Sequence, residues 1–314
     1  MAKVDQAVLT GTGLVVVYTL MISSADAITK FIANGYAAPQ LFALSGVIVA
    51  TLSWGTARFG NTPQSLRTSC PRAMALRAML TVIGSIAFFY AFRWLPFAEV
   101  FVFIGMMPIF AAIFSAPVLK EHARPMAWAA LVAGFIGVLC LFPSGLMSVS
   151  IGHLVAVFAC LCGTMSMVLA RYIGKFETNA LAQVFYPNMA LGVTMAMALP
   201  FVYVAMPVTD LLWVVCYGIF LFAARWLLVV SLRLMAAYAV TPLMNLQFVW
   251  MVVIGAVIFG EIPAANVYLG VAIVIGSGIF LIYEQLQPKP APYPWANWLK
   301  ARQLDVMQKI KIAR

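Results

Sequence analysis

Charged residues are the scarcest class in this sequence. Only 9% of the 314 residues are charged, whereas 64% are hydrophobic. Ordinary soluble domains carry roughly 25% charged residues. A soluble chain of this composition could not cover its own surface with polar groups. The deficit therefore excludes a soluble globular protein and predicts an integral membrane protein.

Groups that perform catalysis or bind metals are also few, with nine acidic residues, two histidines and five cysteines. Cys160 and Cys162 have no His or Cys partner at metal-ligand spacing, so we predict no metal site and no cofactor. His122 lies in a connection and His153 begins an apolar segment, without paired acids or a nucleophile motif. An intramembrane lipid-modifying enzyme would need such a cluster, so it is the least favoured function.

Ten apolar segments are long enough to cross a membrane as helices, which takes roughly 20 residues each. They are 9–29, 37–57, 74–93, 98–118, 126–143, 152–171, 181–204, 210–231, 237–259 and 265–285. Barrel strands would instead alternate polar and apolar residues over about ten positions. The first segment also resembles a cleavable signal peptide, because Lys3 precedes it and Ala25-Asp26-Ala27 ends it. The internal repeat described below requires it to stay, so we predict an all-α membrane protein of ten transmembrane helices.

The net charge of +10 would suggest nucleic-acid binding in a soluble chain. Here the basic residues gather in alternate connections, as expected for one side of a membrane. The even-numbered connections and the tail carry Arg58, Arg67, Arg72, Arg77, Lys120, Arg124, Arg171, Lys175, Arg233, Lys289, Lys300, Arg302, Lys309, Lys311 and Arg314. We expect a multi-pass protein of the cytoplasmic (inner) membrane, with both termini in the cytoplasm, membrane lipid around it and no nucleic-acid partner.

The two halves of the chain repeat at a constant offset of 140 residues. In one ungapped alignment Arg93 matches Arg233, and Glu121 matches Glu261. Because five helices are an odd number, the second copy enters the membrane from the opposite side. The expected units are a first five-helix repeat at 1–145, a second, inverted repeat at 146–286 and a basic cytoplasmic tail at 287–314. Inverted repeats with a site at their shared interface are typical of secondary transporters. We interpret the two glutamates, which end helices, as structural.

The order of features within each half resembles a known family. Each half has an Ala-rich stretch, a helix and a Glu, as in "PFAEVFVFIGMMPIFAAIFSAPVLKE" and "AAYAVTPLMNLQFVWMVVIGAVIFGE", followed by a Gly-containing helix. This order resembles the drug/metabolite transporter (DMT) superfamily, and within it the ten-helix EamA-type transporters. The resemblance implies alternating access, and it implies that the third, fourth, eighth and ninth helices line a central cavity. It leaves the substrate open, because members move amino acids, S-adenosylmethionine, riboflavin, sugars and other metabolites.

The two halves differ in the prolines of their fourth helices. Pro108 lies thirteen residues before Glu121, whereas the second half has Phe248 at the matching position and its proline at Pro242. A proline interrupts the hydrogen-bond ladder of a helix. We therefore expect these two helices to break at different depths.

Arg225 lies deep in an apolar segment, some fifteen residues from its outer end. At 1.5 Å per residue this is about 22 Å, in the inner half of the membrane. A lipid-facing arginine there would cost roughly 2.5 kcal/mol or more. We expect Arg225 to face the protein interior and to hold a carboxylate or phosphate of the substrate. The alternative is that it reaches the cytoplasmic headgroups or binds backbone carbonyls.

Asp26 and Glu99 lie at or just inside the outer boundary of their segments. A carboxylate in a partly desolvated cavity can carry a coupling proton, so both are candidates for proton coupling. The alternative is structural, with Asp26 paired to Lys30 and Glu99 paired to Arg93.

Uncharged polar and aromatic residues on the same helices are further candidates for contact with the substrate. Asn245 and Gln247 follow Pro242, where the helix cannot complete its hydrogen-bond ladder. The remaining candidates are Asn188, Tyr90, Phe103, Trp226 and Trp250. Hydrogen bonds between helices and core packing are the alternative for each of them.

We expect a secondary transporter for a small organic metabolite that is zwitterionic or anionic and has an apolar or aromatic part, such as an amino acid. A lipid flippase or scramblase on the same fold is the alternative. Coupling to a proton or a counter-substrate, the direction of transport and a monomeric or homodimeric state stay open. The tail predicts an interfacial amphipathic helix or a disordered segment.

Overall fold

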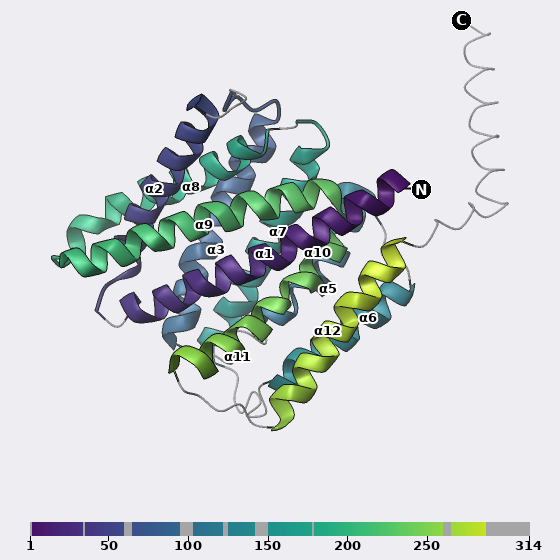
Figure 1. Cartoon of the computed structure of the whole chain (residues 1–314). Helices are drawn as coiled ribbons and strands as arrows, with labels where there is room; N and C mark the ends of the chain where they lie inside the picture. The colour runs from purple at the N-terminus through teal and green to yellow at the C-terminus, as the bar shows by residue number, and fades with distance from the viewer. Residues whose placement is uncertain are drawn as a thin grey trace, which may run out of the picture.

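The structure, a computed structural model, describes residues 2–33, 35–59, 65–94, 103–121, 125–141, 150–177, 179–259 and 265–286. Every regular element within these ranges is a helix (Figure 1). The predicted all-α class is thus confirmed for the described part of the chain. The predictions for Glu99, Glu261 and the tail lie outside it.

The helices coincide closely with the predicted apolar segments. They are α1 (Ala2–Ala33), α2 (Ala38–Phe59), α3 (Pro71–Trp94), α5 (Met107–Leu119), α6 (Pro125–Leu141), α7 (Ile151–Gly174), α8 (Ala180–Ala198), α9 (Val208–Leu234), α10 (Ala237–Met244), α11 (Leu246–Phe259) and α12 (Ala265–Leu286), with a 3-10 turn η1 (Leu199–Phe201) after α8. Apolar runs form helices because a backbone in lipid must satisfy its own hydrogen bonds.

Six of these helices are long and apolar enough to cross a membrane. Their apolar parts are Gln6–Thr29, Ala38–Phe59, Pro71–Ala91, Ile151–Gly174, Ala180–Phe201 and Val208–Leu234. Three shorter apolar helices cover Phe103–Leu119, Pro125–Ile136 and Tyr268–Ser277. By length and composition the described residues therefore contain six candidate spans, and the count of ten stays a prediction.

The helices pack in long pairs (Figure 1). α1 lies along α9, α2 along α8, and α3 along α7, while α6 and α12 form a pair at one edge of the bundle. α5 contacts both α7 and α10, and α1 contacts α10 and α11. Helices from the first and second halves of the chain are therefore interleaved rather than stacked as two separate bundles.

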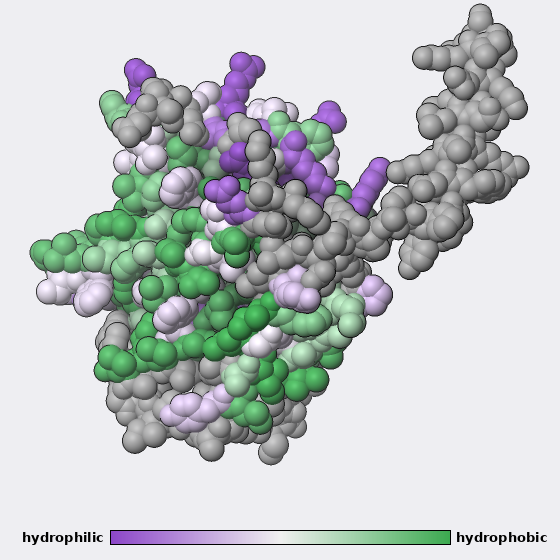
Figure 2. Space-filling view, turned by 45° about the vertical axis from the view of Figure 1, so that its right-hand side comes forward, coloured by the Kyte–Doolittle hydropathy of each residue, from purple (hydrophilic) through white to green (hydrophobic). Residues whose placement is uncertain are grey.

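The outer face of the bundle is apolar over much of its height. Figure 2 shows hydrophobic residues on the flank, with hydrophilic residues gathered mainly at the end drawn at the top. Large side chains that are more than three-quarters exposed include Phe59, Phe201 and Val257. An exposed apolar belt of this extent suits contact with lipid rather than with water.

α2 and α8 cross at two glycines. A Cβ atom placed on Gly46 would lie 2.6 Å from the Cα atom of Gly192 and 3.0 Å from the carbonyl oxygen of Asn188. Small residues let membrane helices approach until their backbones touch. Only glycine fits at position 46 without a shift of the α8 backbone.

The helix breaks lie at nearly the same depth, contrary to the expectation from the prolines. The first helical stretch is interrupted at Met106, and the second at Asn245, between α10 and α11. With the offset of 140, Asn245 corresponds to position 105, one residue from Met106. Pro108 follows its break by two residues, in the first turn of α5, whereas Pro242 precedes its break by three. Pro108 lies where the N–H groups of a new helix have no partner, whereas Pro242 removes an interior N–H of α10 shortly before its break.

Candidate functional site

Arg225 on α9 is only partly buried, and its side chain turns toward α8. Its Nη1 atom donates a hydrogen bond of 2.6 Å to Oδ1 of Asn188, a residue that is only 1% exposed. Nδ2 of Asn188 donates in turn to the carbonyl oxygen of Val184 at 2.6 Å. Two of the candidates thus meet inside the bundle, and the contact of Arg225 is a side-chain amide rather than a backbone carbonyl.

Arg77 on α3 lies beside this pair. Its Nε atom donates to the carbonyl oxygen of Ser166 on α7 at 3.3 Å, and its Nη1 atom donates to the carbonyl oxygen of Gln183 on α8. Arg77 and Arg225 are close enough to repel each other electrostatically. From its place in the sequence, Arg77 was expected among the basic residues of the second connection. A depth count from the start of α3, like that made for Arg225, would have revealed it as a buried cation.

Two buried tyrosines interact electrostatically with both the acidic candidate Asp26 and the basic candidate Arg225. Tyr18 on α1 and Tyr217 on α9 are each 6% exposed. Both interact electrostatically with Asp26 as well as with Arg225. The side chain of Lys30, the alternative partner of Asp26, lies outside the described residues. Asp26 therefore belongs to the same polar region as Arg225 without a direct ion pair between them.

We call Tyr18, Arg77, Asn188, Tyr217 and Arg225 the arginine–tyrosine cluster. Its members come from α1, α3, α8 and α9, so both halves of the chain contribute. Guanidinium and phenol groups are hydrogen-bond donors, and a guanidinium binds planar oxyanions through two N–H groups at once. The cluster can therefore bind an anionic group.

The candidates around the break in α10 and α11 contact α1. Asn245 and Gln247 are 3% and 6% exposed. The carbonyl oxygen of Gln247 accepts a hydrogen bond of 3.1 Å from Oγ of Ser23, and Nε1 of Trp250 donates to Oγ1 of Thr19 at 3.0 Å. These contacts fix the broken helix to the helix that also carries Tyr18 and Asp26.

The structure does not bring all the aromatic candidates to the cluster. Tyr90 is 41% exposed, with its ring centroid 5.2 Å from that of Trp94, and Trp226 is 42% exposed. Phe103 is buried, and its ring lies 5.9 Å from that of His153. Tyr90 and Trp226 are thus exposed, while Phe103 packs in the core.

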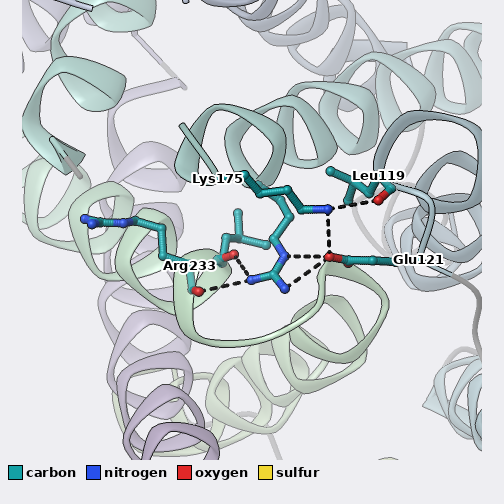
Figure 3. Close-up of polar contacts among 6 residues, drawn as sticks. Leu119, Glu121, Lys175 and Arg233 are labelled. Atoms are coloured by element: carbon teal, nitrogen blue, oxygen red, sulfur yellow. Dashed lines mark hydrogen bonds and ion pairs between the residues drawn. The ribbon is translucent and has the colours of Figure 1, made fainter. Parts of the chain in front are cut away.

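Glu121 forms a separate ionic network at one end of the bundle (Figure 3). Its Oε1 atom lies 3.2 Å from Nη2 of Arg171 on α7 and 3.2 Å from Nζ of Lys175, the residue that follows α7. The Lys175 ammonium also donates to the carbonyl oxygen of Leu119 at 2.9 Å. The network agrees with a structural interpretation of Glu121.

Arg171 extends the network to the end of α9. Its Nη1 atom donates to the carbonyl oxygens of Leu232 and Arg233 at 2.8 and 3.1 Å. The last carbonyl groups of a helix have no partner within the helix, and a guanidinium satisfies them well. Three helix ends, those of α5, α7 and α9, are therefore joined through one carboxylate and one guanidinium.

The opposite end of α9 and the backbone before it are joined to the connection between α1 and α2 and to the start of α2. The hydroxyl of Tyr36 donates to Oδ2 of Asp210 at 2.5 Å, and the side chain of Gln40 makes two hydrogen bonds with the backbone of Val204. The hydrogen bond to Asp210 raises the pKa of the Tyr36 hydroxyl above its usual value. α9 is thus tied to other elements at both of its ends.

Known transporters resemble this chain over most of its length. The EamA-like transporter family matches residues 9–142. A riboflavin transporter of Vibrio cholerae serotype O1 is 24% identical over 219 residues, which cover 69% of this chain and 74% of that protein. An S-adenosylmethionine uptake transporter of Rickettsia felis is 22% identical over 293 residues, which cover 88% and 94%. One crystal structure matches with a TM-score of 0.75 at 18% identity, covering 90% of this chain and 99% of the solved one.

The apolar helices, the buried polar cluster and these matches together define the general class of this protein. The chain is a transmembrane transporter and not an enzyme. Within that class, residues 9–142 match the EamA-like transporter family, which agrees with the resemblance to EamA-type transporters of the DMT superfamily drawn from the sequence.

Proposed function

We propose that this protein is a secondary transporter that moves a small organic metabolite across the cytoplasmic membrane by alternating access. The substrate is zwitterionic or anionic and has an apolar or aromatic part. The observation that carries the proposal is the hydrogen bond of 2.6 Å between Arg225 and Asn188 inside a predominantly apolar bundle. Burying a cation at that depth costs free energy. Such residues are therefore rare, and they typically mark a binding site or a substrate pathway.

The architecture of the proposal is ten spans in two inverted five-helix repeats, 1–145 and 146–286, with a cytoplasmic tail at 287–314. The packing of the helices supports it, because the contacts recur in pairs. α1 lies along α9 as α7 lies along α3, and α2 contacts α9 as α8 contacts α3. The matching depth of the breaks at Met106 and Asn245 is a second support. Repeats related in this way hold a shared site that can open to either side in turn.

The names of the relatives bear on the kind of substrate. Riboflavin and S-adenosylmethionine both contain a flat heterocycle joined to a polar part. In this chain Arg225 would bind the polar part. The proposed contacts for the remaining part of the substrate are Asn245, Gln247, Trp250 and Phe103. Tyr90 and Trp226, which are exposed, are proposed contacts during entry of the substrate.

Asp26 is the proposed carrier of a coupling proton, with Glu99 as the second candidate. The support is the electrostatic contact of Asp26 with Tyr18 and Tyr217, which also reach Arg225. A proton on Asp26 would change the field at the arginine–tyrosine cluster and so the affinity for an anion. Exchange against a counter-substrate would make this proton unnecessary.

Purified protein in liposomes tests the proposal. A thermal-shift screen of metabolites identifies ligands, and flux of each ligand is then measured with and without a pH gradient. We expect flux that Arg225→Ala abolishes and that Arg72→Ala, an exposed arginine on α3, leaves unchanged. Flux and affinity that Arg225→Ala does not alter would remove Arg225 from the site. Lipid flipping without solute flux would instead favour the flippase or scramblase alternative.

A further inference from the structure

Arg77 and Arg225 lie at similar depths from the same end of the bundle. Arg77 is six residues from the start of α3, and Arg225 is nine residues from the end of α9. At 1.5 Å per residue these positions are about 9 and 14 Å from the helix ends. The two ends adjoin the end of α7, since Met74 packs against Ile173 and Gly174 lies against Arg233. Two guanidinium groups therefore share one layer of the bundle.

One short stretch of α8 holds both arginines. Arg77 donates to the carbonyl oxygen of Gln183, and Arg225 donates to the side chain of Asn188, five residues further along. The rise between these positions is about 7.5 Å. The hydrogen bonds thus hold both guanidinium groups against the same short stretch of α8, independently of their electrostatic repulsion.

The partners of both arginines are neutral. Arg77 contacts two backbone carbonyls and Arg225 contacts a side-chain amide, and among the described residues neither has a carboxylate at ion-pair distance. Glu121 neutralises Arg171 and Lys175 instead. Two positive charges in a partly desolvated layer repel each other and lose hydration, and only an anion offsets both effects.

Within the described residues, most of the donors of the two guanidinium groups make no hydrogen bond. An arginine has five N–H donors. The hydrogen bonds described use two donors of Arg77 and one of Arg225. The hydroxyls of Tyr18 and Tyr217 lie within electrostatic reach of Arg225 and add further donors.

We propose that Arg77 and Arg225 form a single site for a substrate group that carries two negative charges on oxygen, such as a phosphate monoester or a dicarboxylate. This inference rests on the proposed transport function and narrows its substrate class. The two arginines come from α3 and α9, one in each proposed repeat, so the bound anion draws the two repeats together. With the offset of 140, Arg77 aligns with Tyr217 and Arg225 with Ser85, so the pair is not a product of the duplication.

Matched probes on the purified full-length protein test the site. Flavin mononucleotide and riboflavin share a ring system and differ by one phosphate, and succinate and succinamate differ by one charge. We expect at least one dianion to bind about tenfold more tightly than its partner, a difference of 1.4 kcal/mol. Binding of flavin mononucleotide alone assigns a phosphate monoester, and binding of succinate alone assigns a dicarboxylate. Equal affinities within both pairs would overturn the proposal.

Variants separate binding from folding. In Arg77→Gln and Arg225→Gln, the ratio of the affinity for the dianion to the affinity for its matched partner should fall close to one. The exposed control Arg72→Gln should leave this ratio unchanged. Arg77 also donates hydrogen bonds to α7 and α8, so the affinities of Arg77→Gln are interpreted only if its melting curve stays cooperative. Arg77→Lys keeps the charge and should retain part of the preference. A ratio that survives in Arg225→Gln and in the folded Arg77 variants overturns the site.

Flux measurements distinguish failure of this inference from failure of the proposed function. Transport of riboflavin without any preference for charge would refute the two-arginine site and leave the transporter proposal intact. A charge preference in binding without flux of any probe would support the site and contradict the transporter proposal.

Discussion

Asn188 determines what Arg225 can bind. Its amide oxygen occupies one N–H of the guanidinium and leaves the charge uncompensated, because an amide is neutral. A carboxylate in its place would satisfy the same N–H and also neutralise the charge. The choice between amide and acid at one position therefore separates an anion site from an internal ion pair.

Asn188→Asp is expected to weaken the binding of anionic ligands by about tenfold or more, because the new carboxylate competes with the ligand for Arg225. Its melting temperature should change little, since the new ion pair offsets the lost hydrogen bond to Val184. Affinity for an anionic ligand found in the screen is the measurement. Asn188→Ala is the matched control and should cost less affinity than Asn188→Asp. Equal losses in both variants would mean that charge at Arg225 is not used in binding.

Tyr36 supports a pH prediction outside the membrane. Its pKa is raised by the hydrogen bond to Asp210, so the folded protein keeps the hydroxyl proton more tightly than the unfolded chain does. The stabilisation is complete below the unfolded pKa and is lost as the pH rises through the raised pKa. Tyr36→Phe should therefore lower the melting temperature at neutral pH. The difference from the wild type should shrink only in strongly alkaline buffer, and a difference that shrinks between pH 6 and 8 would contradict this.

At the scale of elements, the helices were predictable and the breaks were less so. Apolar runs of about 20 residues form helices because lipid offers the backbone no alternative partner. The position of a break within a run depends on which N–H is left unpaired, and a proline can lie before or after it. Pro108 and Pro242 therefore suggested unequal depths, although Met106 and Asn245 interrupt their helices one residue apart.

The residues of the candidate site could be predicted only in part, because local sequence does not give the direction or the partners of a side chain. Neighbouring residues on a helix point about 100° apart, so Arg225 and Trp226 cannot share one narrow face. Arg225 turns to Asn188 while Trp226 is 42% exposed. Arg77 was missed because a basic residue near a helix start is expected to reach water. Its carbonyl partners come from α7 and α8, which no local pattern in α3 predicts.

The network of Glu121 makes a prediction for three helices at once. Glu121→Gln removes the charge that pairs with Arg171 and Lys175. Because the side chains of Arg171 and Glu121 are about four-fifths buried, the expected loss is about 1.5–3 kcal/mol, the range for hydrogen bonds to charged groups. A lower melting temperature is the measurement, and Glu121→Asp should recover part of it. A variant as stable as the wild type would show that the network does not hold these helix ends.

At the scale of the whole molecule, the proposed ten spans predict where the two termini lie. An even number of crossings returns the chain to the side on which it started. Cysteine-free protein with a single cysteine added at either terminus should therefore react with a membrane-impermeant thiol reagent from the same side of the membrane. Labelling from opposite sides would contradict the ten-span architecture and the orientation inferred from the basic residues.

The crossing of α2 and α8 has a consequence for this whole arrangement. At Gly46 the two backbones meet without side chains between them, and the nearest atoms include the carbonyl oxygen of Asn188. A single methyl group there would push α2 and α8 apart, because backbone atoms cannot rotate aside. The strain would shift the segment from Gln183 to Asn188, to which both arginines are hydrogen-bonded. A residue without a side chain thus helps to determine where the two cations lie.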